Sequence, residues 1–215
     1  GLVLVSWSAL LLAEFGVFSI GSLASLVALL FLLALRFMTK ADKNLTFKPQ
    51  NVSFRAIFPL FCLLVVVGFL FFRPFEYFLG GVDPGVYVNT AVSIVKNGSV
   101  LFVDKEMTGL SESSRQVLFT YVPSPWVRSG LAGDTVLDFP PGTLEPHGFH
   151  LFPAWLAVTI SMFGMKLGLL GIPLLALISV FALFVVGKRL FGIPAGFIAA
   201  LLLATNISQV WYSRF

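Results

Sequence analysis

Ten carboxylates occur in the chain, and eight of them fall between residues 73 and 150. Strongly apolar segments flank this stretch, so its acids are the residues best placed for chemistry. Asp83 opens the segment 83–95, whose apolar spacing predicts a helix lying on a membrane surface that Asn97-Gly98 ends. A carboxylate there can serve as the base that deprotonates a hydroxyl. The alternative is an acid that only stabilises the positive end of the helix dipole.

The two histidines, His147 and His150, follow Glu145 near the end of the same stretch. Imidazole and carboxylate are ligands of divalent metals, so Asp83, His147 and His150 form a candidate metal site. Without a metal, Glu145, His147 and His150 are candidates to contact a phosphate. A third interpretation is a set of polar residues at the start of an interfacial helix. Candidates for a second acid are Asp134, Asp138 and Glu145.

Arg214 follows Trp211 and Tyr212 at the end of an apolar segment. It is either a fixed cation for a phosphate or an arginine that snorkels from an aromatic belt at a membrane interface.

The composition favours an integral membrane protein, because 58% of the residues are apolar and 11% are charged. The net charge of +4 does not indicate nucleic-acid binding, since the basic residues lie beside apolar segments, as the positive-inside rule expects. Cys62 is the single cysteine, which excludes a disulfide framework within the chain. The apolar start and end of the sequence predict a piece of a longer protein.

The basic residues predict the topology. Residues 1–37 form either one long apolar segment or two short spans; we favour two, with a turn near residues 19–22, which places Glu14 inside the first span. A basic cytoplasmic linker follows them. Residues 55–72 then run outward to an external loop over 73–150, which holds strands at 100–103 and 117–122 and ordered loop over 123–148. Residues 150–164 form an interfacial or re-entrant helix, 167–187 run inward, Lys188-Arg189 marks a cytoplasmic turn, and 193–212 run outward.

Three stretches resemble the GT-C superfamily of membrane glycosyltransferases that use polyprenyl-phosphate sugars, especially the aminoarabinose transferase and protein O-mannosyltransferase branch. The first is Asp83-Pro84-Gly85-Val86-Tyr87, followed by Ala91 and Asn97-Gly98. The second runs from Pro146-His147-Gly148-Phe149-His150 to Trp155, with Met162-Phe163-Gly164 beyond it. The third runs from Gly187-Lys188-Arg189 to Tyr212-Ser213-Arg214. The branch often carries a basic residue where Glu145 and its neighbours stand, which leaves the mode of phosphate binding open.

The resemblance implies an all-α, multi-span helical bundle with an N-terminal segment over 1–53 and a catalytic module over 54–215. It implies a multi-pass protein of the plasma (inner) membrane that moves a sugar from a polyprenyl-phosphate donor to a protein, lipid or glycan acceptor on the non-cytoplasmic face. Asp83 is then the catalytic residue, and Tyr87, Glu145, His147, His150 and Arg214 bind substrate, with or without a divalent metal ion. Two rival interpretations are a transporter or flippase that binds lipid-linked glycan and a non-catalytic membrane scaffold.

Overall fold

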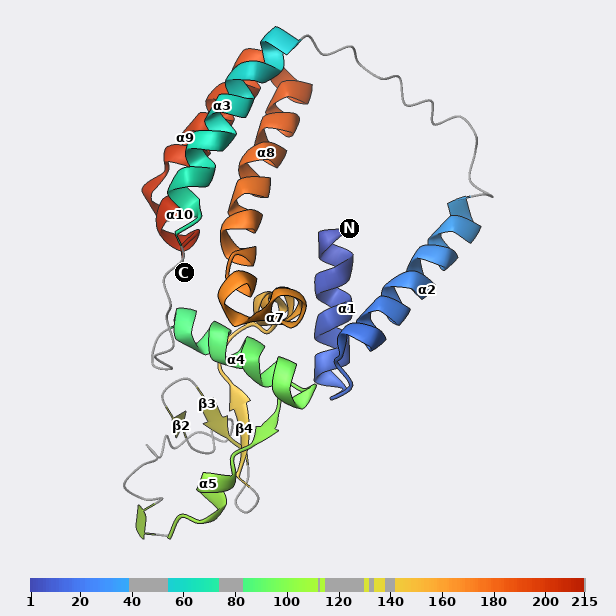
Figure 1. The fold of residues 1–215 in the computed structure, drawn as a ribbon, viewed down its shortest axis with the longest axis vertical. Helices are drawn as coiled ribbons and strands as arrows, with labels where there is room; N and C mark the ends of the chain where they lie inside the picture. Colours follow the sequence, from blue (N-terminus) through green and yellow to red (C-terminus); the bar gives the residue numbers. More distant parts are fainter. Residues whose placement is uncertain are drawn as a thin grey trace. The chain divides into compact units, whose positions relative to one another are not determined.

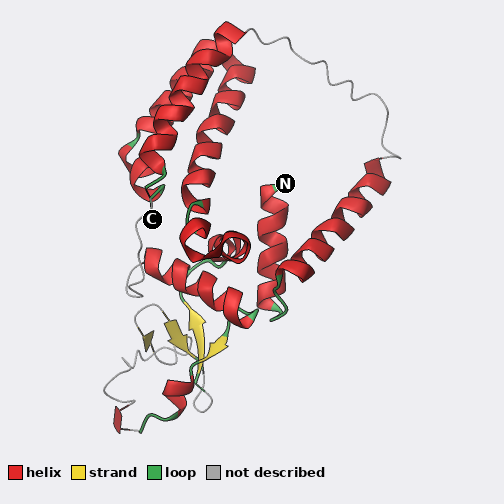
Figure 2. Ribbon diagram, viewed as in Figure 1, coloured by secondary structure: helices red, strands yellow, loops and turns green. Residues whose placement is uncertain are grey.

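The structure is a computed structural model that describes residues 1–38, 54–73, 83–111, 113–114, 130–131, 134–137 and 142–214. Helices dominate these residues, with one small sheet (Figure 2). The chain forms two compact units, one of residues 1–37 and 77–168 and the other of residues 38–76 and 169–215. The first unit groups the N-terminal helices with most of the predicted external loop, and the division at residue 53 stays a prediction.

The first unit begins with two helices, α1 (Leu2–Glu14) and α2 (Ile20–Met38), as predicted (Figure 1). The turn between them starts at Phe15, a few residues before the predicted position. Gly16, at φ +70°, donates its N–H to Ala13, and the N–H of Val17 reaches Leu12. This pattern of bonds around a left-handed glycine terminates a helix. Glu14 is therefore the last residue of α1 and not, as predicted, inside a span.

Helix α4 (Asp83–Asn97) confirms the predicted amphipathic helix at the head of the loop. Pro84 lies in its first turn, where a missing N–H costs little. Gly98, at φ +71°, ends the helix by donating its N–H to Ile94. The carbonyl of Gly98 accepts the N–H of Phe18, and a Cβ at Gly98 would lie 3.1 Å from the carbonyl oxygen of Phe18. The end of α4 is thus bound to the turn between α1 and α2.

A four-stranded antiparallel sheet follows α4 in the order β1-β4-β3-β2. Its strands are β1 (Phe102–Val103), β2 (Gly130–Leu131), β3 (Asp134–Val136) and β4 (Thr143–Pro146). The strand expected at 100–103 is present only over its last two residues, and 117–122 lie outside the described residues. The prediction of loop over 123–148 is wrong where β2, β3 and β4 lie. A short helix, α5 (Lys105–Thr108), is capped by the carboxylate of Asp104.

Helix α7 (Leu151–Gly168) packs against both α1 and α4 and supplies the core of the first unit, since all of residues 153–160 are buried. Its helical geometry breaks at Gly164 (φ 76°, ψ 172°), where the sequence predicts that the helix ends. Thr159 donates its hydroxyl to the carbonyl of Gly168, and a Cβ at Gly168 would lie 2.5 Å from Cα of Ile160. The residues after Gly164 therefore fold back onto the helix.

The second unit contains α3 (Phe54–Phe71), α8 (Gly171–Phe191), α9 (Ile193–Thr205) and α10 (Ile207–Tyr212). Figure 1 shows that α3 and α9 run in the same direction and α8 in the opposite one. A Cβ at Gly196 would lie 2.7 Å from backbone atoms of Phe184 and Lys188, so only glycine permits this approach of α8 and α9. The core consists of Leu60, Val67, Phe71, Val180, Phe184, Ala200 and Ala204.

The segment predicted as one span over 193–212 is two helices. Asn206 separates them with an extended backbone (ψ 126°), and its side-chain oxygen accepts the N–H groups of Ser208 and Gln209. Asparagine is a strong helix N-cap, so it begins α10 as a new helix.

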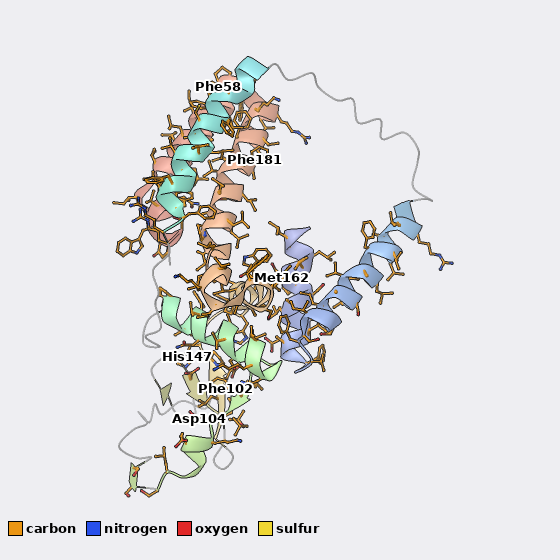
Figure 3. The ribbon with its side chains drawn as sticks, viewed as in Figure 1. Phe58, Phe102, Asp104, His147, Met162 and Phe181 are labelled. Carbon is orange, nitrogen blue, oxygen red and sulfur yellow. The ribbon has the colours of Figure 1, made fainter. Side chains whose placement is uncertain are left out.

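Among the residues that the structure describes, two helices, α7 and α8, are by total length and composition candidates to cross a membrane, while the apolar segments of α1, α2, α3 and α9 are shorter. Large apolar side chains face outward in the second unit: Phe58 on α3 is 53% exposed and Phe181 on α8 is 47% exposed (Figure 3). The unbroken part of α7, residues 151–163, measures roughly 20 Å at about 1.5 Å per residue, less than the roughly 30 Å hydrocarbon core of a bilayer.

Candidate functional site

Tyr87 joins the first two sequence motifs. It lies on α4, and its ring meets the turn between β4 and α7: a Cβ at Gly148 would lie 3.3 Å from Cε1 of Tyr87. The ring also packs edge-on against Phe152, with 5.7 Å between the ring centroids and an interplanar angle of 82°. Gly148 has φ +96°, so this close approach occurs at a position that favours glycine. The motif that begins at Asp83 therefore contacts the motif that begins at Pro146.

Asp83 is exposed at the first position of α4, one helical turn before Tyr87. Residues four apart share a face of a helix, so Asp83 and Tyr87 lie on the same side of α4. The helix dipole stabilises the ionised carboxylate at this end. Asp83 thus presents its carboxyl group to the surroundings of the unit, one helical turn before Tyr87, whose ring contacts the turn at Gly148.

His150 connects this turn to the first helix. Its Nδ1 atom lies 3.0 Å from Oε1 of Glu14, and its Nε2 atom lies 3.1 Å from the carbonyl oxygen of Pro146. A carbonyl oxygen only accepts, so Nε2 carries a proton and donates it. One proton also lies between Nδ1 of His150 and the Glu14 carboxyl group, and it is carried either by the histidine or by the glutamic acid. Both nitrogens of His150 are thus engaged within the protein.

His147 lies on the exposed side of the same turn, directly after β4 (Figure 3). Asp134 on β3 pairs with Pro146 on β4, the residue before His147. Burial raises the pKa of the Asp134 carboxyl, and the positive charge of nearby His147 partly offsets that rise. Glu145 precedes Pro146 on β4 and pairs with Thr135 on β3. The sheet therefore brings one candidate second acid, Asp134, next to a candidate histidine, while Asp138 lies outside the described residues.

The divalent metal site expected at Asp83, His147 and His150 stays a prediction. Over the part of the chain that the structure describes, no three His, Cys, Asp or Glu side chains are grouped as a metal would require. His150 offers no lone pair on Nε2, which a metal would need. The divalent ion stays a prediction from the sequence, and we derive no chemical step through it.

Arg214 belongs to the second unit, where it follows α10. Its Nε atom donates to the carbonyl oxygen of Leu70 at the end of α3, at 3.1 Å. The guanidinium is thereby held by one N–H, and its other donors remain for a ligand.

Sequence reasoning named six site residues and noted Glu14 only as an acid within an apolar segment; the structure adds its contact with His150. The sequence did mark Glu14 as unusual, because a carboxylate within an apolar segment is rare and is usually paired or functional. Its partner was not recognisable, since 136 residues separate Glu14 from His150.

Over the described residues the protein is mostly helical, with α7 and α8 as candidate membrane spans by length and composition, and acids and histidines lie around the turn between β4 and α7. No known family profile, curated protein or solved structure matches the chain.

Proposed function

We propose that the protein is a multi-pass membrane glycosyltransferase of the GT-C type that moves a sugar from a polyprenyl-phosphate donor to a hydroxyl acceptor on the non-cytoplasmic face. The observation that carries this proposal is the contact of Tyr87 with Gly148 and Phe152. The two stretches that resemble the family lie some 60 residues apart in the sequence and meet at one turn. Asp83 stands one helical turn from that contact.

In the proposed reaction, the acceptor oxygen attacks the anomeric carbon of the donor sugar. Asp83 takes the proton of the acceptor hydroxyl, and the bond between the anomeric carbon and the phosphate oxygen breaks with its electron pair left on the phosphate. The exposure of Asp83 suits a base that must meet an acceptor arriving from water. Tyr87 and His147 flank the same turn and would position the substrates.

The chain direction within the second unit supports the same orientation. Lys188 and Arg189 end α8, and Arg214 follows α10 at the opposite end of the unit (Figure 1). With Lys188 and Arg189 on the cytoplasmic side, as basic residues prefer, Arg214 faces the non-cytoplasmic side.

The decisive experiment measures transfer of radiolabelled sugar from a panel of polyprenyl-phosphate hexose and pentose donors to membrane acceptors. The native protein should consume at least one donor, and Asp83→Asn should lower turnover by a factor on the order of 100. Asp104→Asn is the matched control, because asparagine retains the cap on α5, and its activity should stay native. Donor that crosses the bilayer with its sugar intact would instead favour a transporter. Full activity of Asp83→Asn would reduce Asp83 to a residue that stabilises the helix.

A further inference from the structure

Two backbone hydrogen bonds join the turn between α1 and α2 to the segment that follows α4 (Figure 1). The N–H of Phe18 donates to the carbonyl oxygen of Gly98 at 2.9 Å, which links the turn to the end of α4. The N–H of Val100 donates to the carbonyl oxygen of Ala13 at 3.2 Å. The two segments therefore lie side by side, and we call the place where they meet the junction.

Exposed apolar side chains lie beside both bonds of the junction. Val17 directly precedes the donor Phe18, and Leu101 directly follows the donor Val100. The side chains of Val17 and Leu101 are both exposed. Two residues that lie 84 positions apart in the sequence (101 minus 17) thus bring apolar surface to one place on the first unit.

The contact between Glu14 and His150 adds two more exposed side chains. Glu14 is the neighbour of Ala13, so this contact belongs to the same junction. Phe15 directly follows Glu14 and is 78% exposed, and Phe149 directly precedes His150 and is 87% exposed. Single exposed apolar residues are ordinary, but several gathered at one place mark a contact surface. The junction patch consists of Phe15, Val17, Leu101 and Phe149.

A stripe of exposed apolar residues on α1 leads to the junction patch. Residues four apart lie on one face of a helix, and at this spacing the exposed residues are Val3, Trp7, Leu11 and, directly after the helix, Phe15. Helix α1 packs against α7 with another face and leaves this stripe uncovered within the unit. In a membrane protein, lipid tails cover an apolar face of this kind as well as an apolar protein surface would. Lipid is therefore the partner that fits the patch in which the stripe ends.

Polar groups beside the patch indicate its depth in a membrane. Glu14 is half exposed, and His147, two residues before Phe149, is exposed. Carboxylate and imidazole groups are costly in the hydrocarbon core, whereas headgroups and water solvate them. Apolar and polar side chains are both accommodated at the boundary between headgroups and acyl chains, which interfacial segments enter by about 5–10 Å.

We propose that the junction patch inserts into one leaflet of a lipid bilayer, at the boundary between headgroups and acyl chains. The two backbone bonds then hold the turn between α1 and α2 and the segment 98–101 in the same leaflet. Part of the loop that the sequence predicts to be external is thereby a surface that contacts lipid. This contact requires the chain to lie in a membrane, but it does not require the protein to transfer a sugar.

The test measures the surroundings of a fluorescent label in the full protein, reconstituted in phosphatidylcholine nanodiscs. Val17→Cys, Leu101→Cys and Phe149→Cys, each in a Cys62→Ser background, are labelled with nitrobenzoxadiazole. Lipid that carries a nitroxide high on its acyl chain should quench these labels on the order of threefold more strongly than a label at Ser113→Cys, because insertion brings them within its reach. Aqueous iodide should quench in the reverse order. Ser113 is the matched control, since it is exposed in the same unit but lies beyond α5.

The labels at positions 17 and 101 should also report the same depth, because the junction holds them together. Iodide quenching as strong as that at the control position would show that the patch faces water and would overturn the proposal. Protection from both quenchers would overturn it too, since it would indicate a protein partner, and chemical cross-linking would show whether that partner is a second copy of the chain. If Leu101→Cys does not fold, Val103→Cys replaces it, because Val103 is exposed and residues two apart in an extended segment lie on one side. Sugar transfer plays no part in these measurements, so an inactive protein can confirm the patch and an active one can refute it.

Discussion

The Nδ1 atom of His150 lies 3.0 Å from Oε1 of Glu14, although 136 residues separate the two in the sequence. Glu14 is half exposed and His150 is mostly buried, with exposed fractions of 47% and 14%. The contact ties the end of α1 to the turn that carries His147 and Gly148. It therefore links the N-terminal helix directly to the candidate site.

Loss of this contact should destabilise the first unit modestly. Glu14→Gln and His150→Ala should show a coupling energy of about 0.5–1 kcal/mol in a double-mutant cycle, small because Glu14 is partly solvated. Thermal unfolding in detergent measures it. Glu106→Gln on α5 is the control, since it removes an exposed acid away from His150 and should not couple to it. Strictly additive effects of Glu14→Gln and His150→Ala would show that the contact contributes nothing.

Asp134 should make stability depend on pH. Burial raises its pKa in the folded state above the ordinary 3.8, so its protonated form is the one that folding favours. Its contribution is fully present below the unfolded-state pKa and is lost as pH rises through the folded-state pKa. The stability advantage of the native protein over Asp134→Asn should thus shrink as pH rises from about 3.5 to 7. Curves that stay parallel across unfolding scans in this range would contradict the assignment.

Replacement of Gly98 should be costly. At φ +71°, with the Phe18 carbonyl oxygen 3.1 Å from the position of a Cβ, alanine meets both backbone strain and a close contact. We expect Gly98→Ala to lower the free energy of unfolding by about 1–2 kcal/mol. Gly21→Ala, within α2 and with only an ordinary contact to the Ser19 hydroxyl oxygen at 3.8 Å, should instead be neutral or stabilising by up to about 1 kcal/mol. A Gly98→Ala variant as stable as Gly21→Ala would contradict this account of the α4 terminus.

Labelling of single cysteines tests the proposed topology. Cys62 is exposed on α3 and is first replaced with serine. A cysteine at Ser113, in the proposed external loop, should react with an impermeant maleimide in intact cells, and one at Arg189 should react only after the membrane is opened. Both positions are exposed on the protein, so a difference in labelling reports the side of the membrane. The reverse result would invert the orientation on which the active face depends.

Local signals in the sequence predict the helices of this protein well. Asp83-Pro84 and Asn97-Gly98 define α4 because a proline near the start and a glycine at the end act within one helical turn. Gly164 likewise gives the break in α7. The small sheet was not predictable in the same way, since strands of two to four residues have no measurable alternation and depend on distant partners. Asn206 lies in a short polar stretch with Thr205, Ser208 and Gln209, and the apolar residues on both sides made 193–212 read as one span.

The candidate site was predictable residue by residue but not as an arrangement. Tyr87 and the turn at Gly148 were chosen from separate motifs, and only the fold shows that they touch. Glu14 shows what the sequence could not predict, because its one side-chain contact is with His150, 136 residues away. The two hydrogen-bond partners of His150, Glu14 and the Pro146 carbonyl, could not be predicted from the sequence.

The distance along the chain between Glu14 and His150 also bears on how the protein is made. A ribosome adds about 5–20 residues per second. The 136 residues that separate the two partners therefore take roughly 7–27 s to emerge. During that interval α1 exists without α7, the helix against which it packs in the folded unit. Nascent chains should accordingly depend on a chaperone or on the insertion machinery to shield this helix until its partner arrives.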